Sequence, residues 1–474
     1  MLLRQVIGYA PSLLIPALAT FGAIFCYTRL LSPADFGSFS LVLSTMVLLN
    51  AVFFSWSQIA LVRLAPQAIK DGRLSELRAT VQLLFAGISL LLIAGAALVI
   101  GCIPIGHIRI LVALAVPLAL VRSLLNMNQA FHRSALNIRS YNIIECGQAI
   151  LGLAMGITLV YFLHLGNVGA IIGMIFGMAV MSLVDLKTML QTAFKHASPQ
   201  AIKGITQFSL PIVATLGFSM IISTSDRYLI DFFRGADQVG YYAAGYTLMD
   251  RINQILFNLV GTPSYPLLVH RLENEGVDGA RAQTHTNGMV MLALVLPACT
   301  GLILTARQLD TIFIGSALRS GAIQVMPWIA AASLFNGIAS HYFDMAFHLA
   351  KRPHLLWFTR GPAAAFSLCA NLLLIPRFGY IGAAWSAFGS YLLLLVLTIV
   401  ISRRAFPLHF PTGPALKIAA STALMAGVLA PIPFPETLLG LAGMVILGAA
   451  TYGAGLLAFD VLNLRTRLLA LVGH

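Results

Sequence analysis

Apolar stretches long enough to cross a membrane recur from one end of this chain to the other, and no other feature restricts its fold as strongly. A helix of about 20 apolar residues spans the roughly 30 Å hydrocarbon core of a bilayer. The composition agrees, because 59% of the 474 residues are hydrophobic, only 9% are charged and the mean hydropathy is +0.88. We therefore predict an all-α, polytopic integral membrane protein.

We predict about 14 transmembrane helices of about 21 residues each. These helices use about 294 positions and leave about 180 for all connections and ends, so no soluble catalytic domain fits. The predicted spans are Ile7 to Tyr27, Ser38 to Leu61, Val81 to Ile100, Ile110 to Met127, Ile143 to Leu163, Val168 to Leu186, Phe208 to Ile230, Val239 to Gly261, Asn287 to Leu304, Ile323 to Ala346, Leu356 to Ile375, Tyr380 to Ile401, Leu416 to Pro431 and Leu438 to Leu457. The longest connections, Ala65 to Ala79 and Pro263 to Thr286, are predicted on the cytoplasmic side.

The distribution of Lys and Arg predicts the orientation, because short loops rich in these residues stay in the cytoplasm. With the N-terminus inside, about 20 of the 29 fall in inner segments, Lys187, Lys195, Arg465 and Arg467 among them, and about 7 fall in outer segments. We expect a multi-pass protein of the cell inner (cytoplasmic) membrane with both termini cytoplasmic. The net charge of +13 follows from this bias, so no nucleic-acid partner is expected. The 5 cysteines are scattered, and neither a metal nor another cofactor is predicted.

Two pairs of turns in the chain resemble each other. The run Pro33-Ala-Asp-Phe-Gly-Ser-Phe-Ser leads into span 2, and Gly235-Ala-Asp-Gln-Val-Gly-Tyr-Tyr-Ala leads into span 8. The run Leu165-Gly-Asn-Val-Gly-Ala leads into span 6, and Phe378-Gly-Tyr-Ile-Gly-Ala leads into span 12 at nearly the same separation. This pattern indicates an internal repeat. The competing interpretation is that Gly-x-x-Gly-Ala is common in membrane helices, where small residues allow close packing.

The repeat predicts the domain organisation. Six spans return the chain to its starting side, so two such halves share one orientation about an axis along the membrane normal. We predict an N-terminal six-helix lobe over residues 1–206, a C-terminal six-helix lobe over 207–404, and two additional transmembrane helices with a cytoplasmic tail over 405–474. Two such bundles would face each other across a central cavity.

Polar residues inside three spans lie at helical spacing, and a charge at mid-bilayer costs about 2.5–3.5 kcal/mol unless it faces a cavity or a partner. Span 4 has such a stripe at i, i+4, i+7 and i+11, span 8 has a similar one, and span 10 has a thinner one through Ser333, Gly337, Ser340 and Asp344. Arginine matches phosphate oxygens bidentately, so the stripes predict a water-filled passage for a polyanion. The candidate substrate-binding residues are Arg122, Asn126, Gln129, Tyr246, Asp250, Arg251, Gln254, Asn258 and Asp344.

Other interpretations of these charges stay open. Asp250 can neutralise Arg251, in which case the pair only holds helices together. Asp226 and Arg227 end span 7, where an exposed capping pair competes with a functional site. Two further carboxylates, Glu145 and Asp185, are expected near the inner surface of the membrane. A metal or proton site at His341, Asp344 and His348 is disfavoured, since no fourth ligand is evident. 

The run Arg29-Leu-Leu-Ser-Pro-Ala-Asp-Phe-Gly-Ser-Phe-Ser-Leu, with Ala60-Leu-Val-Arg63, resembles the opening of the polysaccharide biosynthesis flippases of the multidrug/oligosaccharidyl-lipid/polysaccharide (MOP) exporter superfamily. The run Asp226-Arg-Tyr-Leu-Ile, followed by Gly240-Tyr-Tyr-Ala-Ala-Gly-Tyr, is also similar to that family. The resemblance implies two six-helix lobes, alternating access and a substrate of undecaprenyl pyrophosphate carrying an oligosaccharide. It implies that Arg251 lines the cavity. Span 1 departs from related flippases because its arginines, Arg4 and Arg29, lie near its ends.

The leading functional prediction is therefore a flippase for a lipid-linked oligosaccharide or related polysaccharide intermediate. Its expected partners are the lipid-linked glycan, the bilayer, and a glycan polymerase and glycosyltransferases. One alternative is a cation-coupled drug or small-molecule exporter of the same superfamily, which would need an acidic pocket in the first lobe. The alternative from another class is a membrane-embedded glycan polymerase or ligase. Such an enzyme needs catalytic groups on a long outer loop, and none is predicted, so we do not expect an enzyme.

Overall fold

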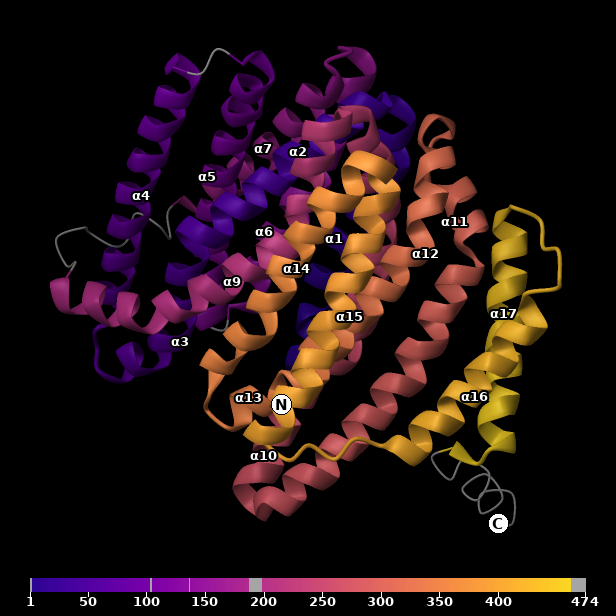
Figure 1. Ribbon diagram of the computed structural model, residues 1–474. Helices are drawn as coiled ribbons and strands as arrows, with labels where there is room; N and C mark the ends of the chain where they lie inside the picture. The colour runs from indigo at the N-terminus through magenta and orange to yellow at the C-terminus, as the bar shows by residue number, and fades with distance from the viewer. Residues whose placement is uncertain (1, 103–104, 136, 187–197, 462–474) are drawn as a thin grey trace. The chain divides into compact units, whose positions relative to one another are not determined.

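A computed structural model of the chain describes residues 2–102, 105–135, 137–186 and 198–461, and these residues form α-helices joined by short turns (Figure 1). The predicted basic residues Lys187, Lys195, Arg465 and Arg467 lie outside the described residues. The chain divides into two compact units, Met1–Gly240 and Tyr241–His474. This boundary lies within a helix, later in the chain than the predicted end of the first lobe at residue 206, and the assignment of the lobes stays a prediction.

The first unit consists of successive long helices and one π-helical turn. They are α1 (Leu2–Leu30), α2 (Pro33–Leu49), the π-turn η1 (Asn50–Phe54), α3 (Ser55–Lys70), α4 (Leu74–Cys102), α5 (Gly106–Ser134), α6 (Ile138–Phe162), α7 (Gly166–Val184) and α9 (Pro199–Arg234). The helix α6 packs along α1 and α7, and α5 packs against α2, α3, α4 and α7. A buried apolar cluster at Leu61, Val81 and Phe131 joins α3, α4 and α5.

The second unit begins inside α10 (Ala236–Leu304), which supplies two crossings. Its other elements are α11 (Ala306–Phe313), α12 (Ser316–Ile338), the π-turn η3 (Ala339–Phe343), α13 (Met345–Leu349), the 3-10 turn η4 (Pro353–Leu355), α14 (Leu356–Phe378), α15 (Tyr380–Ala405), α16 (Thr412–Leu429) and α17 (Leu438–Ala458). The helix α15 packs against α12 and α14, while α16 and α17 form a separate antiparallel pair, yellow in Figure 1.

The prediction of an all-α membrane protein with about 14 crossing helices is confirmed. Within the described residues, twelve helical segments are long and apolar enough to cross a membrane. One of the twelve is α10, which contains both the eighth and the ninth predicted spans. The seventh predicted span lies in α9, a helix of 36 residues outside those twelve.

The two connections predicted to be the longest are mostly helical instead. The helices α3 and α4 extend into the first connection, and α10 continues through the second with a single break at Gly276 (φ 70°, ψ −160°). Ion pairs one helical turn apart stabilise the helix on both sides of that break, Arg271 with Glu275 and Arg281 with Asp278. The polar composition of these segments indicated that they lie outside the membrane, but a polar segment outside the membrane can still be helical.

The two pairs of similar turns have matching local structures. Gly166 starts α7 with φ 54°, and Gly379 precedes α15 with φ 61°. This left-handed conformation is accessible to glycine at little cost. At the other pair, a Cβ on Gly37 would lie 1.8 Å from the Ala236 carbonyl oxygen, and a Cβ on Gly240 would lie 2.1 Å from the Pro33 carbonyl oxygen. The first turns of α2 and α10 therefore touch each other, backbone against backbone.

Replacing Gly37 with Ala should destabilise the first unit, because the new methyl group must displace the first turn of α10. Overpacking of this kind costs about 1–3 kcal/mol. The matched control is Gly95→Ala on α4, where no atom lies within 4 Å of the added Cβ, and helix propensity there favours Ala by up to about 1 kcal/mol. Thermal unfolding in detergent should show a lower midpoint for the first variant only. Equal midpoints for both variants would contradict the close approach.

The short helix α11 attaches the α16–α17 pair to the rest of the second unit. The Gln308 side chain donates to the Phe434 carbonyl oxygen at 3.4 Å, and the Thr311 hydroxyl donates to the Glu436 carboxylate at 3.2 Å. Between these contacts, the Asp310 carboxyl group is buried. Burial raises the pKa of Asp310 to about 7, Arg319 opposes that rise, and Glu436 adds to it. The folded protein therefore holds a proton on Asp310 that the unfolded chain releases.

This proton makes stability depend on pH in a defined window. The contribution of Asp310 is complete below pH 4 and is lost as the pH rises to about 7, because the ordinary pKa is 3.8. At 1.36 kcal/mol per pKa unit the loss is at most about 4 kcal/mol. Asp310→Asn should flatten the change in unfolding midpoint between pH 5 and pH 8, whereas the exposed control Asp71→Asn should leave it unchanged. A wild-type slope in the Asp310 variant would refute the assignment.

Candidate functional site

In the first unit, the residues of the predicted stripe on α5 differ in burial along the helix. Arg122 and Asn126 are half-buried, Gln129 is buried, and Arg133 is exposed. The Arg122 guanidinium donates to the Gln148 side chain of α6 at 3.3 Å. Among the described residues, no hydrogen bond of the Asn126 side chain is found. The stripe thus offers one half-buried guanidinium and one amide with hydrogen-bonding capacity.

Gln129 and His132 contact two carboxylates, Glu145 and Asp185, which were expected near the inner surface of the membrane. The Gln129 amide donates to Glu145 of α6. His132 and Asp185 form a buried hydrogen-bonded pair, with the imidazole Nε2 2.9 Å from a carboxylate oxygen. Only 5% of His132 and 8% of Asp185 are exposed. The Asp185 carboxylate thus ties the end of α7 to α5 inside the unit, and its expected place near the inner surface of the membrane stays a prediction.

Two further buried polar residues of α5, Ser123 and Asn128, were missed by the search for helical stripes. Asn50, in the π-turn η1, donates to the Ser123 hydroxyl at 2.8 Å, and Gln58 of α3 donates to the Ser123 carbonyl oxygen at 3.3 Å. Asn128 is 1% exposed, and neither its amide nitrogen nor its oxygen has a hydrogen-bond partner among the described residues. A buried unpaired group costs about 1–3 kcal/mol. The feature of the sequence that could have indicated these residues is the density of Ser, Asn, Gln and His along α5.

In the second unit, three of the candidates on α10 form one connected group. Gln254 donates to the Asp250 carboxylate at 2.6 Å and accepts from the Arg251 guanidinium at 3.2 Å. Ser333 of α12 donates to the other Asp250 oxygen at 3.2 Å. The amide of Gln254 therefore links the two charges. Arg251 and Gln254 are exposed, so this guanidinium is available to a ligand.

The remaining three candidates lie apart from that group. Tyr246 is buried and packs against the ring of Tyr242, with centroids 5.5 Å apart. Asn258 is exposed, one turn beyond Gln254. Asp344 is 4% exposed and forms an ion pair with Arg360 of α14 at 2.6 Å.

The π-turn η3 explains why Asp344 departs from the stripe predicted on span 10. The backbone N–H of Asp344 donates to the carbonyl oxygen of Ala339, five residues back rather than four. The extra residue in that turn rotates all later side chains around the helix axis, so Ser333 and Asp344 no longer share a face. Nothing in the regular spacing of the sequence marked this insertion.

The pair Asp226 and Arg227 is buried, not exposed as a capping pair would be. Asp226 is 2% and Arg227 is 7% exposed. The Arg227 guanidinium lies 3.4 Å from the Asp226 carboxylate and donates to the Ser223 carbonyl oxygen at 2.7 Å. Burial of a charge requires such compensation. These residues therefore belong to the interior of α9, close to its contact with α2, where Tyr228 and Thr45 are hydrogen-bonded at 2.8 Å.

The three residues weighed as a metal or proton site have other contacts. His341 stacks on Phe257 with centroids 5.4 Å apart, and His348 contacts the edge of Tyr265. Within the described part of the chain, no group of three or more His, Cys, Asp or Glu residues could hold a metal ion.

These features define the chain as a polytopic membrane protein with an arginine-bearing polar face in each unit. Residues 2–271 match the family described as polysaccharide biosynthesis protein. The chain belongs to the polysaccharide biosynthesis protein family, as its motifs suggested. No curated protein sequence matches the chain.

Solved structures with the same fold come from the MOP superfamily. One is described as lipid II flippase MurJ in an inward closed conformation, with a TM-score of 0.78, 14% identity, and coverage of 96% of this chain and 99% of that chain. An inward-facing multidrug resistance MATE family transporter has a TM-score of 0.64, 13% identity and coverage of 82% and 93%. A MOP superfamily transporter from Pyrococcus furiosus has a TM-score of 0.58, 14% identity and coverage of 85% and 94%. The family and this fold place the chain with membrane transporters rather than with enzymes.

The buried pair of His132 and Asp185 should be required for stability. Asp185→Asn keeps the size of the side chain but removes its charge, and breaking a buried pair costs about 3–5 kcal/mol. The double replacement His132→Leu with Asp185→Leu should lose less, because it leaves no uncompensated polar group. Unfolding midpoints of Asp185→Asn and of the double variant test this order. A double variant less stable than Asp185→Asn would show that the site depends on the polar groups themselves.

Proposed function

We propose that this protein is a flippase, which moves an undecaprenyl-pyrophosphate-linked oligosaccharide or a related polysaccharide intermediate across the cytoplasmic membrane by alternating access. Its termini are cytoplasmic in this proposal, and residues 1–206 and 207–404 act as the two lobes. The single observation that carries it is the presence of an arginine in the polar face of each unit, the half-buried Arg122 and the exposed Arg251. Membership of the polysaccharide biosynthesis protein family supports the same conclusion.

The chemistry of the substrate explains the need for these arginines. A pyrophosphate cannot enter hydrocarbon without partners for its charges. Guanidinium groups stay charged at any physiological pH and donate two parallel hydrogen bonds to phosphate oxygens. Gln254 holds Arg251 at the exposed surface of α10, and Gln148 holds Arg122 on α5. Side-chain amides hold a guanidinium without neutralising it, which a carboxylate in the same place would do.

The fold of lipid II flippase MurJ supports a lipid-linked substrate, since that structure covers nearly the whole chain, including α16 and α17. The MATE transporter structures cover a smaller share. The alternative of a drug exporter would require an accessible carboxylate in the first unit. There, Asp185 is buried against His132, while the half-buried Glu145 accepts from the Gln129 amide.

Neutralising both arginines should stop lipid translocation without preventing folding. Arg122→Gln with Arg251→Gln removes charge-assisted hydrogen bonds worth about 1.5–3 kcal/mol each, so the rate should fall at least about 10-fold. The assay follows undecaprenyl pyrophosphate bearing a fluorescent sugar in proteoliposomes, with a membrane-impermeant quencher to report the outer leaflet. Lys417→Gln, which removes one positive charge at an exposed position of α16, is the control and should flip at the wild-type rate.

Three outcomes separate the possibilities. A wild-type rate in the double arginine variant would refute the role of these side chains. A wild-type protein that moves cationic dyes but no polyprenyl pyrophosphate would favour the drug exporter. A third variant carries Arg122→Lys and Arg251→Lys. A translocation rate between that of the double Gln variant and that of the wild type would support the charge requirement, because an ammonium keeps the charge but loses the bidentate geometry.

A further inference from the structure

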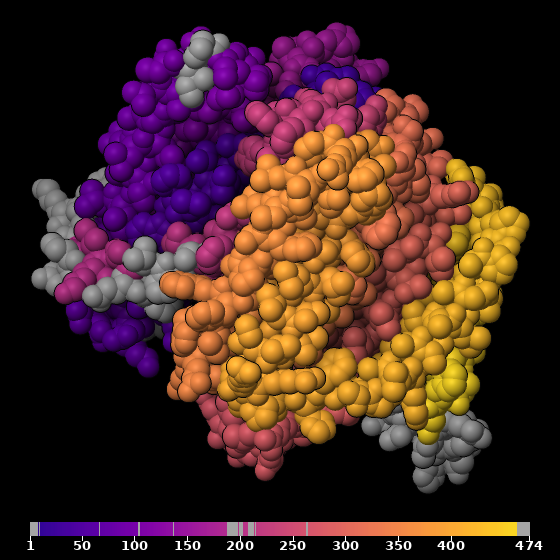
Figure 2. Space-filling model, in the orientation of Figure 1, coloured from indigo at the N-terminus to yellow at the C-terminus, as the bar shows by residue number. Residues whose placement is uncertain are grey.

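The segment that joins α15 to α16, residues 406–411, crosses the surface of the second unit as an extended strap (Figure 2). Its side chains alternate. Phe406, Leu408 and Phe410 pack against the apolar core, whereas Pro407 and His409 are exposed. The Phe410 ring stacks on Phe343, with centroids 5.8 Å apart. Alternation of this kind directs every second side chain to the same face, so the buried residues fix the exposed position of His409.

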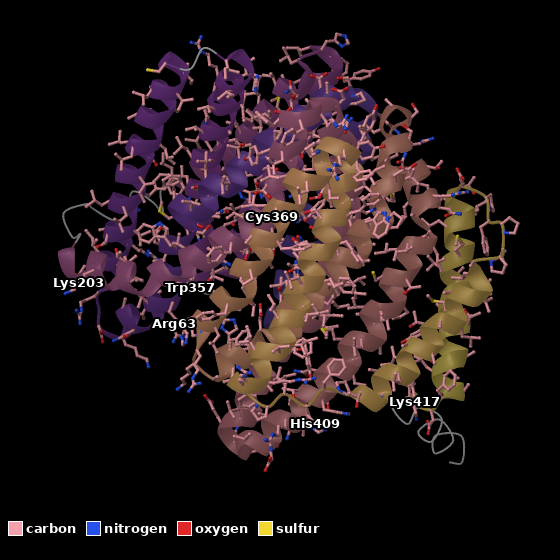
Figure 3. The ribbon with its side chains drawn as sticks, viewed as in Figure 1. Arg63, Lys203, Trp357, Cys369, His409 and Lys417 are labelled. Carbon is pink, nitrogen blue, oxygen red and sulfur yellow. The ribbon has the colours of Figure 1, made fainter. Side chains whose placement is uncertain are left out.

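Hydrogen bonds on both sides of His409 hold its backbone. Its N–H donates to the Thr284 hydroxyl of α10 at 3.3 Å, and its carbonyl oxygen accepts from the buried Tyr342 hydroxyl at 3.1 Å. The imidazole is thereby placed beside His285 of α10, with ring centroids 5.6 Å apart. Figure 3 labels His409 on this segment at the end of the unit where α10 turns. These contacts fix the position of the His409 side chain on the surface.

The two imidazoles line an open pocket of about 470 Å³, whose other lining residues are Arg281, Ala282 and Thr286. Arg281 and His285 are four residues apart and so share a face of α10. No lining residue carries a carboxylate. Two imidazoles and a guanidinium can donate hydrogen bonds, whereas the Thr286 hydroxyl already donates to the Ala282 carbonyl oxygen at 3.1 Å. The pocket therefore presents donors to whatever enters it.

Arg281 has one ionic contact, which leaves it able to serve a ligand. Its guanidinium lies 3.1 Å from the Asp278 carboxylate, and the side chain of Asp278 is 92% exposed. An exposed pair of this kind contributes about 0–1 kcal/mol. A phosphate that contacts both imidazoles and the guanidinium forms stronger bonds, so it can compete with Asp278.

We propose that this pocket binds the phosphate group of an anionic phospholipid. It lies between the start of the ninth crossing, on α10, and the start of the thirteenth, on α16, which is the level at which lipid headgroups meet protein. In the predicted topology this end is cytoplasmic, where basic pockets between transmembrane helices hold anionic headgroups. A bound lipid would connect the strap to α10 and so anchor the α16–α17 pair. The proposal does not depend on which substrate the protein transports.

Lipid binding to the purified full-length protein tests the proposal. Phosphatidylglycerol, phosphatidylcholine and inorganic phosphate are titrated separately in detergent, and binding is measured by native mass spectrometry for the lipids and by competition for the ion. Arg281→Gln should weaken phosphatidylglycerol binding about 10-fold, since a hydrogen bond to a charged group contributes about 1.5–3 kcal/mol. His409→Gln and His285→Gln should each weaken it, and Arg281→Lys should retain part of the affinity.

Arg271→Gln is the matched control, because Arg271 lies on the same helix, is similarly exposed and also pairs with an acidic residue, Glu275. It should bind phosphatidylglycerol as the wild type does. Competition by inorganic phosphate at the concentration of the lipid would support the phosphate site and assign it to a soluble anion. Equal losses in the Arg271 and Arg281 variants would overturn the proposal, as would wild-type binding by the variant lacking Arg281, His285 and His409. Unfolding midpoints measured alongside exclude misfolded samples.

Discussion

In the hydrocarbon core of a membrane, no water is available to bond a free N–H or C=O group, and this constraint governs the whole molecule. Each crossing must bond its own backbone, so the chain forms long helices, and α10 extends its helix even beyond the crossing. The polar groups of side chains then still need partners inside the membrane. In the first unit they are paired across helices, as with His132 and Asp185, and in the second unit Asp344 is paired with Arg360.

The paired charges and the accessible arginines have different roles within this constraint. An ion pair between two helices compensates both charges and fixes the helices in one register. Arg122 and Arg251 are instead held by glutamine side chains, which orient the guanidinium without adding a charge of their own. The proposed function uses both kinds of group, because the bundle must be stable while the arginines stay able to bind a substrate.

Hydrophobic periodicity predicted the membrane crossings well, since a span of about 20 apolar residues has few other stable structures. The contacts among Asp250, Arg251 and Gln254 follow from their spacing of three and four residues on one helix. The prediction for Asp344 depended on regular spacing, and the π-turn η3 changed that spacing through packing that one sequence does not reveal. Partners from distant helices, such as Asp185 for His132, were likewise beyond any local pattern.

The contact between Gly37 and Gly240 changes what the similarity of their two turns means. Each glycine faces the backbone of the other turn, so a side chain added to either glycine would collide with that backbone. Likeness between two turns of one chain is usually read as a trace of common origin. Here mutual contact is a second reason for it, because each turn keeps its glycine only as long as the other stays close.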